Sequence, residues 1–327
     1  PRARCPRARR LVSRIVVYGV TGQLGRELVE SLDATRWSID ELVGVASPES
    51  FGRDFEFRGE ELDVLAEAPP LKGRDLVVIC TPKGPALEII RDALRAEVPC
   101  IDCSGALAGQ AAVPLWHPND PQAAKSPVLA LPSSTALAWR PLLEALGAAA
   151  GLERLSATIL SSAGAWGGEG VASLSSESIA LFNQSEAPPV GPAGRAIAFD
   201  VAPGGPLDLE RVKGELRREH GESLRLALAA LQVPTFVGEG AMISVGLARA
   251  IEPDALEAAL AARSELVVGE DASLRDAVGG TTVRIGPVEA DASGEAGRSH
   301  RLWLALNPIR LVADAALRAA GQRLGLR

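Results

Sequence analysis

Short apolar runs alternate with amphipathic segments in the first part of the chain. Residues 14–18 form an apolar, β-branched run that predicts a buried strand. Glycines follow at once, and residues 26–32 then carry leucine and valine at helical spacing. The same patterns predict strands at 42–46, 75–80 and 99–102 and a helix over 85–96. Strands that alternate with helices predict a parallel sheet covered on both faces.

After residue 134 the pattern changes to longer strands with polar alternation, which is typical of a mixed or antiparallel sheet. Helices are predicted over 137–147, 171–183, 209–231, 254–263 and 308–324, and strands over 155–160, 234–248, 281–285 and 301–306. We therefore expect an α/β protein with two domains. A Rossmann-type parallel-sheet domain covers 13–133 and includes the C-terminal helix 308–325, and an α+β domain with a mixed sheet covers 134–307.

The composition excludes several classes of protein. The chain has 327 residues, and a chain of this length buries about three quarters of its unfolded surface, so it needs neither a metal ion nor a disulfide to fold. The net charge of −7 disfavours nucleic acids and anionic membranes as partners. We interpret the arginines within residues 2–14 as a loose terminus rather than as a nucleic-acid-binding or targeting tail.

The apolar runs also bear on location. None reaches the roughly 18 residues that a membrane helix needs. The run from residue 11 to residue 20 is interrupted by Ser13 and Arg14, which argues against a signal peptide. The sequence therefore predicts a cytoplasmic protein.

The sequence contains four cysteines: Cys5, Cys80, Cys100 and Cys103. Cys100 and Cys103 form a C-x-x-C motif, which can indicate redox activity or half of a zinc site. The second half of such a zinc site is missing and histidine is scarce. We therefore favour the interpretation that these are two small residues at the end of a strand, and we expect no metal ion.

A G-x-T-G-x-x-G motif joins the first predicted strand to the first predicted helix. Glycines allow a tight turn and a close approach of the backbone to a pyrophosphate, and the free N–H groups of the helix start favour its negative charge. The strand, turn and helix that this motif requires are all predicted. A turn kept only for helix–sheet packing is the alternative. The candidate cofactor contacts are Gly19, Thr21, Gly22, Gln23, Leu24 and Gly25.

Further candidate contacts to NAD or NADP follow the other strands. Ser47 and Glu49 come after the second strand, where the ribose selector usually lies. Glu49 would accept hydrogen bonds from a ribose 2′-OH and repel a 2′-phosphate, which favours NAD over NADP. A solvated loop glutamate is the alternative. Thr81, after the third strand, and Gly164, in the glycine-rich stretch 163–170, complete the candidate set.

The order of these motifs resembles that of the aspartate-semialdehyde dehydrogenases over residues 13–320. Residues 98–106, V-P-C-I-D-C-S-G-A, are similar to that family's V-V-I-D-N-S-S-A, and residues 233–238, V-P-T-F-V-G, to its V-P-V-F-N-G. Residues 14–31, 45–62, 113–118 and 196–200 also match in order. The N-acetyl-γ-glutamyl-phosphate reductases share the architecture, but their motifs fit less well.

The resemblance implies a chemistry and an assembly. In this family a cysteine thiolate attacks an acyl phosphate, and hydride from NADPH reduces the resulting thioester. The sheet of the second domain forms a homodimer interface. In the present chain the segments 243–247 and 303–306 are apolar enough to be core or interface.

The residues that carry this chemistry are replaced in this sequence. Ser134 stands in P-S-S-T where the family has its nucleophilic cysteine, and Glu239 stands where it has its histidine base. Gln232 and Ala108 occupy the positions of two anion-binding arginines, and Arg211 aligns best with a substrate lysine. The loss of the nucleophile, the base and two arginines together suggests that this protein has abandoned the family's reaction.

Three hypotheses follow for the function. The first is a member of the family without acyl-phosphate reductase activity, which binds an unidentified small molecule as a homodimer. The second is an active NAD(P)-dependent oxidoreductase that acts on an aldehyde or an acyl phosphate, supported by the intact glycine turn. The third is a hydrolase-like site that uses Ser134 with Glu239, although a serine needs a strong adjacent base.

Overall fold

The structure is a computed structural model that describes residues 13–50, 52–120, 125–186, 188–270 and 272–326. The arginine-rich start and Cys5 lie outside these ranges. The chain folds into two compact units. The first contains the described residues up to Leu131 and from Ala313 onward, and the second spans Pro132–Val312.

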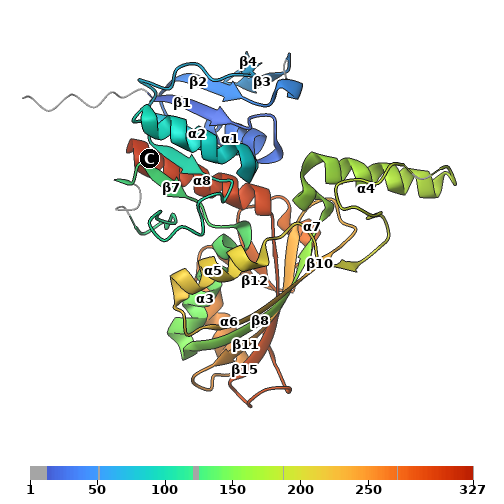
Figure 1. Ribbon diagram of the computed structural model, residues 1–327. Helices are drawn as coiled ribbons and strands as arrows, with labels where there is room; N and C mark the ends of the chain where they lie inside the picture. The colour runs from blue at the N-terminus through green and yellow to red at the C-terminus, as the bar shows by residue number, and fades with distance from the viewer. Residues whose placement is uncertain (1–12, 51, 121–124, 187, 271, 327) are drawn as a thin grey trace, which may run out of the picture. The chain divides into compact units, whose positions relative to one another are not determined.

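The first unit is built on a mainly parallel sheet (Figure 1). Its strands are β1 (Ser13–Tyr18), β2 (Ile39–Val45), β3 (Asp54–Phe57), β4 (Glu60–Leu65), β5 (Leu76–Ile79), β6 (Cys100–Asp102) and β7 (Val128–Ala130). They lie in the order β3-β4-β2-β1-β5-β6-β7, and only the β3–β4 pair is antiparallel among the described pairings. The helical segments between them are α1 (Gln23–Asp33), the 3-10 turn η1 (Pro48–Ser50) and α2 (Lys83–Arg95).

The apolar strands of this sheet pack against helices. Val16, Val77 and Ile79 are fully buried and share one core cluster with Ala86 and Ile90 of α2. Leu28 and Leu32 of α1 are also buried. Strands without polar alternation are typical of a parallel sheet with both faces covered, which explains why the sequence predicted this unit well.

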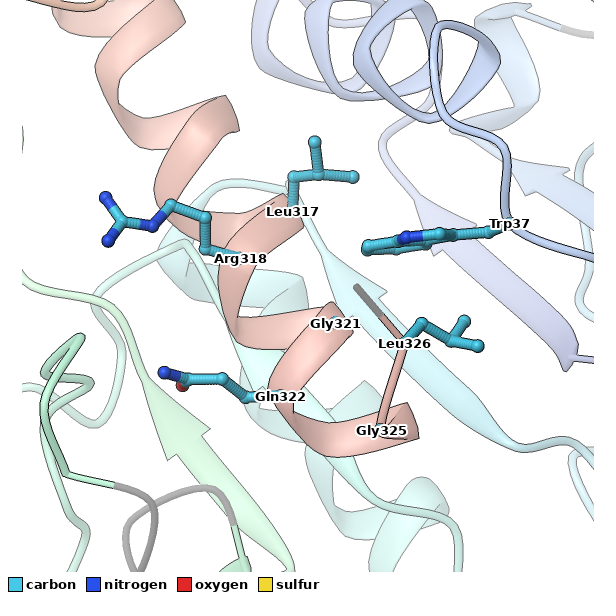
Figure 2. A pocket seen from close by; sticks show the side chains of 7 residues that line it. All are labelled: Trp37, Leu317, Arg318, Gly321, Gln322, Gly325 and Leu326. Carbon is cyan, nitrogen blue, oxygen red and sulfur yellow. The ribbon is translucent and has the colours of Figure 1, made fainter. Parts of the chain in front are cut away.

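The end of α8 (Pro308–Leu324) packs within the first unit. Gly321 lies so close to Trp37 that a Cβ there would be 3.0 Å from the indole ring. Figure 2 shows Trp37 facing Leu317 and Leu326 around a pocket of about 550 Å³. The indole of Trp116 donates to Gln322 Oε1 at 2.9 Å. These contacts tie the C-terminal helix to the parallel-sheet unit.

The second unit contains a mixed sheet (Figure 1). Its strands are β8 (Leu152–Ser161), β9 (Ala202–Pro203), β10 (Arg225–Gln232), β11 (Glu239–Leu247), β12 (Leu266–Val268), β13 (Val283–Ile285), β14 (Glu289–Ala290) and β15 (Ser299–Leu306). They lie in the order β12-β13-β15-β11-β8-β10-β9, and β14 pairs with β15. The helical segments are α3 (Ser134–Ala150), η3 (Ala163–Trp166), α4 (Gly167–Phe182), α5 (Leu209–His220), α6 (Pro253–Ala261) and α7 (Leu274–Ala277).

The two faces of the central strands differ in burial. Ile243, Val245 and Leu302 point to one face and belong to the core formed with α3, α5 and α6. The alternate residues of β8, β10 and β11 are mostly small or polar, with the larger Leu160, Leu231 and Met242 among them, and most remain partly or fully exposed. A parallel-sheet unit followed by an α+β unit with a mixed sheet confirms the predicted fold class.

One predicted helix is wrong. The sequence predicted a single helix over 209–231, whereas α5 ends at His220 and β10 begins at Arg225. Gly221, at φ +98°, ends the helix because glycine adopts this backbone conformation without strain. The following leucines and alanines form helices readily, but parallel pairing with β8 makes them a strand.

No helix within the described ranges combines the length and the apolar character needed to cross a bilayer.

Candidate functional site

The glycine turn connects β1 to α1. A Cβ at Gly19, whose φ is +80°, would lie 2.8 Å from the Cys80 carbonyl carbon and oxygen. A Cβ at Gly25 would lie 2.1 Å from the Gly19 carbonyl oxygen. At Gly22 the nearest atom would be 3.2 Å away. Close packing therefore requires Gly19 and Gly25, whereas Gly22 mainly leaves its backbone uncovered.

The start of α1 leaves backbone donors for a ligand. Gly22 is the N-cap residue, and among the described residues neither a side-chain cap nor an acidic first-turn residue is present. The N–H groups of Gln23, Leu24 and Gly25 precede the first intrahelical hydrogen bonds. Such groups, together with the helix dipole, bind anions. The geometry fits the pyrophosphate of a dinucleotide.

A cavity of about 1040 Å³ lies at the carboxyl edge of the first unit's sheet. Its walls come from the glycine turn, the end of β2, the segment 66–72 and the length of α2 from Pro85 to Arg95. Thr81 lines it, and the buried Thr81 hydroxyl has no hydrogen-bond partner among the described residues. A buried hydroxyl without a partner is costly unless a ligand or water supplies one. The cavity therefore fits a ligand with polar groups, as a dinucleotide has.

The loop after β2 forms the rim of this cavity. Ser47 and Pro48 line it, and the exposed Glu49 follows them. The Ser47 side chain and the Glu49 backbone both hydrogen-bond to the Glu49 carboxylate, and these bonds lower its pKa. Thr21 Oγ1 lies 3.1 Å from Ser50 Oγ, which links the glycine turn to this loop. The rim therefore carries a negative charge next to the end of β2.

In the second unit, Ser134 and Glu239 lie within hydrogen-bonding distance. Ser134 Oγ donates to Glu239 Oε2 at 3.4 Å, which is a long contact, and Thr135 Oγ1 donates to Glu239 Oε1 at 2.8 Å. Glu239 is only 6% exposed. Burial raises the pKa of Glu239 to about 7, against the effect of the hydrogen bonds from Thr135 and Ser134. This carboxyl group therefore changes its charge near neutral pH.

A second carboxylate lies beside the same helix start. Ser133, the N-cap residue of α3, donates to Glu215 Oε2 through its N–H at 2.9 Å and through its hydroxyl at 2.5 Å. Arg211 Nε donates to Glu215 Oε1 at 2.7 Å. Glu215 is buried, so this ion pair is a fixed part of the structure. Arg211, aligned with the family's substrate lysine, is thus engaged by an internal carboxylate.

Gln232 is held by its own neighbours. Its amide nitrogen donates to the backbone oxygens of Ser161 at 3.0 Å and Val233 at 3.1 Å. Its amide oxygen accepts from Trp166 Nε1 at 2.7 Å. Both N–H donors are therefore used within the protein, and the buried amide presents no charge.

The remaining predicted positions have packing roles. A Cβ at Gly164 would lie 2.9 Å from the Phe236 carbonyl oxygen, which accepts from the Gly164 N–H. Ala108 belongs to the first unit and is buried after a turn closed by Asp102, which accepts from Leu107 N at 3.0 Å. The structure thus brings Ser134 and Glu239 together, while Gly164 and Ala108 offer no side-chain group for chemistry.

Cys100 is not suited to the role of the nucleophilic thiolate that the resemblance implies. Cys100 is buried in the core cluster of β5 and α2, and burial, followed by the charge of Asp102, raises its pKa to about 12. Its thiol is therefore protonated at neutral pH. Among the described residues, no group of three or more His, Cys, Asp or Glu side chains could hold a metal ion.

Sequence reasoning missed three residues that contact the candidate positions of the second unit. Thr135 follows Ser134 directly in P-S-S-T, so its proximity could have been noticed. Glu215 lies four residues after Arg211 on one helix, a spacing that favours an ion pair. Trp166 gave no signal, because its contact with Gln232 joins η3 to the end of β10.

Comparison with known proteins identifies the class. The family described as semialdehyde dehydrogenase, NAD binding domain, matches residues 14–126. The chain is 28% identical over 314 residues to a USG-1 protein homolog of Azotobacter vinelandii, covering 90% of this chain and 93% of the relative. It is 24% identical over 321 residues to the aspartate-semialdehyde dehydrogenase of Aquifex aeolicus, covering 91% and 93%.

Solved structures agree with this comparison. A probable aspartate-semialdehyde dehydrogenase from Pseudomonas aeruginosa superposes with a TM-score of 0.84 at 25% identity, covering 95% of this chain and 97% of the other. Aspartate semialdehyde dehydrogenase II from Vibrio cholerae, complexed with ASA, gives 0.86 at 22% identity with the same coverage. The glycine turn, the parallel sheet and the mixed-sheet unit define a two-unit α/β protein with a Rossmann-type first unit. Residues 14–126 match the semialdehyde dehydrogenase NAD-binding domain, and most of the chain is similar to aspartate-semialdehyde dehydrogenases, the family that its motifs resemble.

Proposed function

We propose that this protein is a dinucleotide-binding member of its family that does not reduce acyl phosphates. The observation that carries the proposal is the pair formed by Ser134 and Glu239. At these positions the resemblance requires a thiolate and an imidazole, and this chain supplies a hydroxyl and a buried carboxyl group. A serine would form an ester, whose carbonyl accepts hydride less readily than that of a thioester.

The two positions where the resemblance expects anion-binding arginines also disfavour an anionic substrate. Gln232 is uncharged and its donors are used internally, and Ala108 has no polar side chain. Each charge-assisted hydrogen bond lost in this way is worth about 1.5–3 kcal/mol. The buried carboxyl groups of Glu215 and Glu239 lie at the α3 start, where a bound anion would otherwise be favoured.

Kinetics with the purified protein test this proposal. We expect no saturable oxidation of NADPH in the presence of an acyl phosphate. Saturable turnover would overturn the proposal. The combined variant Ser134→Cys, Glu239→His, Gln232→Arg, Ala108→Arg should show more activity than Ser134→Cys alone, because the four positions act as one unit.

Glu49 leads us to propose that NAD binds better than NADP. A carboxylate at the end of β2 accepts hydrogen bonds from the ribose 2′-OH and repels a 2′-phosphate. Calorimetric titration with both dinucleotides tests this preference, and Glu49→Arg should reverse it. Failure to bind either dinucleotide at millimolar concentration would end the proposal of a dinucleotide function.

An active oxidoreductase for an aldehyde or acyl phosphate is the second candidate, favoured by the intact turn and cavity. Dinucleotide reduction with a panel of aldehydes separates it from the first.

The hydrolase-like use of Ser134 with Glu239 is favoured by their contact and by a carboxyl pKa near 7. Labelling of Ser134 by a fluorophosphonate probe would support that use, and absence of labelling would count against it.

We also propose that the protein is a cytoplasmic homodimer that pairs through the exposed sheet face of the second unit. Ala229, Thr158 and Met242 form a row across β10, β8 and β11, and Met242 is 49% exposed. Such uncharged positions on one sheet face suit face-to-face packing of two sheets. Thr158→Arg should give a monomer in sedimentation, while Glu60→Arg on β4 should not.

A cytoplasmic location agrees with the thiols of Cys80, Cys100 and Cys103.

A further inference from the structure

The register of β5 and β6 brings together two cysteines that are far apart in the sequence. Ile79 pairs with Asp102 in this parallel ladder, and the next positions are Cys80 and Cys103. Cys103 N donates to Ile79 O at 3.0 Å, which completes the last bridge of the ladder and holds Cys103 beside the end of β5. Cys80 N donates to Tyr18 O at 2.8 Å, which holds Cys80 in line with β1. Cys80 and Cys103 are therefore lateral neighbours at the carboxyl edge of the sheet.

Both side chains belong to the same face of the sheet. Val77, Ile79 and Cys100 pack into the core cluster that includes α2. Side chains alternate between faces along a strand, so residues 80 and 103 project to the other face. The two cysteines of the C-x-x-C motif thus lie on opposite faces and cannot meet. The partner that the fold gives Cys103 is Cys80.

The spacing of the pair suits a covalent link. Neighbouring strands lie about 4.7–4.9 Å apart, and disulfides join Cα atoms that are about 4.4–6.8 Å apart. Cys80 and Cys103 are both partly exposed, whereas Cys100 is buried. Cys80 is also one of the residues that line the cavity of the first unit.

We propose that Cys80 and Cys103 form a dithiol that hydrogen peroxide oxidises to an intrachain disulfide at the edge of the cavity. One thiolate attacks a peroxide oxygen and becomes a sulfenic acid as the O–O bond breaks and water forms. The second thiol then attacks that sulfur, the S–S bond forms and a second water leaves. Two thiols lose two electrons in total, and one peroxide is reduced to two waters. This proposal does not depend on whether a dinucleotide binds.

Disulfide mapping tests the proposal directly. The full chain carrying Cys5→Ser is treated with hydrogen peroxide, alkylated with iodoacetamide after denaturation, digested without reduction and analysed by mass spectrometry. We expect a peptide that links Cys80 to Cys103, loss of this link after dithiothreitol, and alkylated Cys100. A link between Cys100 and Cys103, or separate sulfinic acids at Cys80 and Cys103, would overturn the proposal.

Single variants provide the matched controls. Cys100→Ser should leave the link intact, and loss of the link in this variant would contradict the assignment. In Cys103→Ser the partner is gone, so Cys80 should advance from sulfenic to sulfinic acid under the same treatment. Equal thermal unfolding of Cys103→Ser and the parent chain before oxidation shows that this change reflects chemistry rather than misfolding.

Discussion

Two helix starts in this protein use the same backbone donors in opposite ways. In the first unit, α1 begins at Gly22 with no side-chain cap and faces a cavity of about 1040 Å³. In the second unit, α3 begins at Ser133, whose side chain accepts from Ala136 N at 3.2 Å, and two buried carboxyl groups lie beside it. The N–H groups at the start of α1 are open to an external anion, whereas the N–H groups at the start of α3 bond to side chains of the protein itself.

This difference shows how one structural device becomes either a ligand site or part of the core. A helix start attracts negative charge in both cases. The carboxyl groups of Glu215 and Glu239 occupy the α3 start from within the protein, and Arg211 pairs with Glu215 there. The contrast predicts that changes at α1 alter dinucleotide binding, while changes at α3 alter stability and its dependence on pH.

The largest effect is expected for Gly25→Val in the first unit. Its Cβ would lie 2.1 Å from the Gly19 carbonyl oxygen, so the turn must shift. We expect a loss of about 3 kcal/mol or more in the free energy of unfolding, together with loss of dinucleotide binding. Urea unfolding measures the first and calorimetry the second. Gly84→Ala in α2, with open space around its Cβ, is the control, and equal stability of both variants would refute the packing argument.

The second prediction concerns Glu239→Gln. Folding raises the pKa of Glu239 from 4.5 to about 7, so the folded protein holds a proton that the unfolded chain has lost in this range. The contribution of Glu239 to the free energy of unfolding is therefore complete below pH 4.5, where the carboxyl group is protonated in both states. It is lost as the pH rises through 7, where the buried group must ionise. The variant should gain about 3 kcal/mol relative to wild type at alkaline pH, and little at acid pH.

Thermal unfolding across pH measures this difference. Glu60→Gln, at an exposed position on β4, provides the control for loss of a carboxylate. A stability difference between wild type and Glu239→Gln that stays constant with pH would contradict a raised pKa at Glu239.

A smaller effect is expected for Thr135→Val. This change removes the 2.8 Å hydrogen bond to Glu239 Oε1 and should cost about 1–3 kcal/mol, because a buried acceptor loses its donor. The cost should grow above pH 7, where the acceptor is charged. Ser134→Ala removes a 3.4 Å contact and should cost less. Thermal unfolding compares the two, and the reverse order would mean that Ser134 is the main partner of Glu239.

The smallest effect on stability is expected for Gly22→Ala. The new Cβ would lie 3.2 Å from the Gly19 carbonyl oxygen, a tight contact that a small shift relieves. We expect a change in stability below about 1 kcal/mol, but about tenfold weaker dinucleotide binding, since the methyl group covers the bare backbone. Unchanged affinity would support the view that the turn is kept only for packing.

The local pattern predicted the first unit better than the second. The β1 strand, the glycine turn and α1 are consecutive in the chain, so their signals are read from neighbouring residues. By contrast, the segment 225–232 is rich in leucine and alanine, and its strand conformation comes from pairing with β8, about seventy residues earlier in the register. The sequence left open whether the apolar residues of 243–247 belong to the core or to an interface. Ile243 and Val245 lie in the core of the second unit.

The sequence by itself determined the strands and helices of the first unit and the glycine turn, because these depend on residue type and local spacing. Only the tertiary structure decided which groups meet. It buried Glu239 with Thr135, engaged Gln232 with Trp166, and paired Ile79 of β5 with Asp102 of β6, next to Cys80 and Cys103. These contacts arise from strand register and from packing between distant segments, and local spacing carries no information about either.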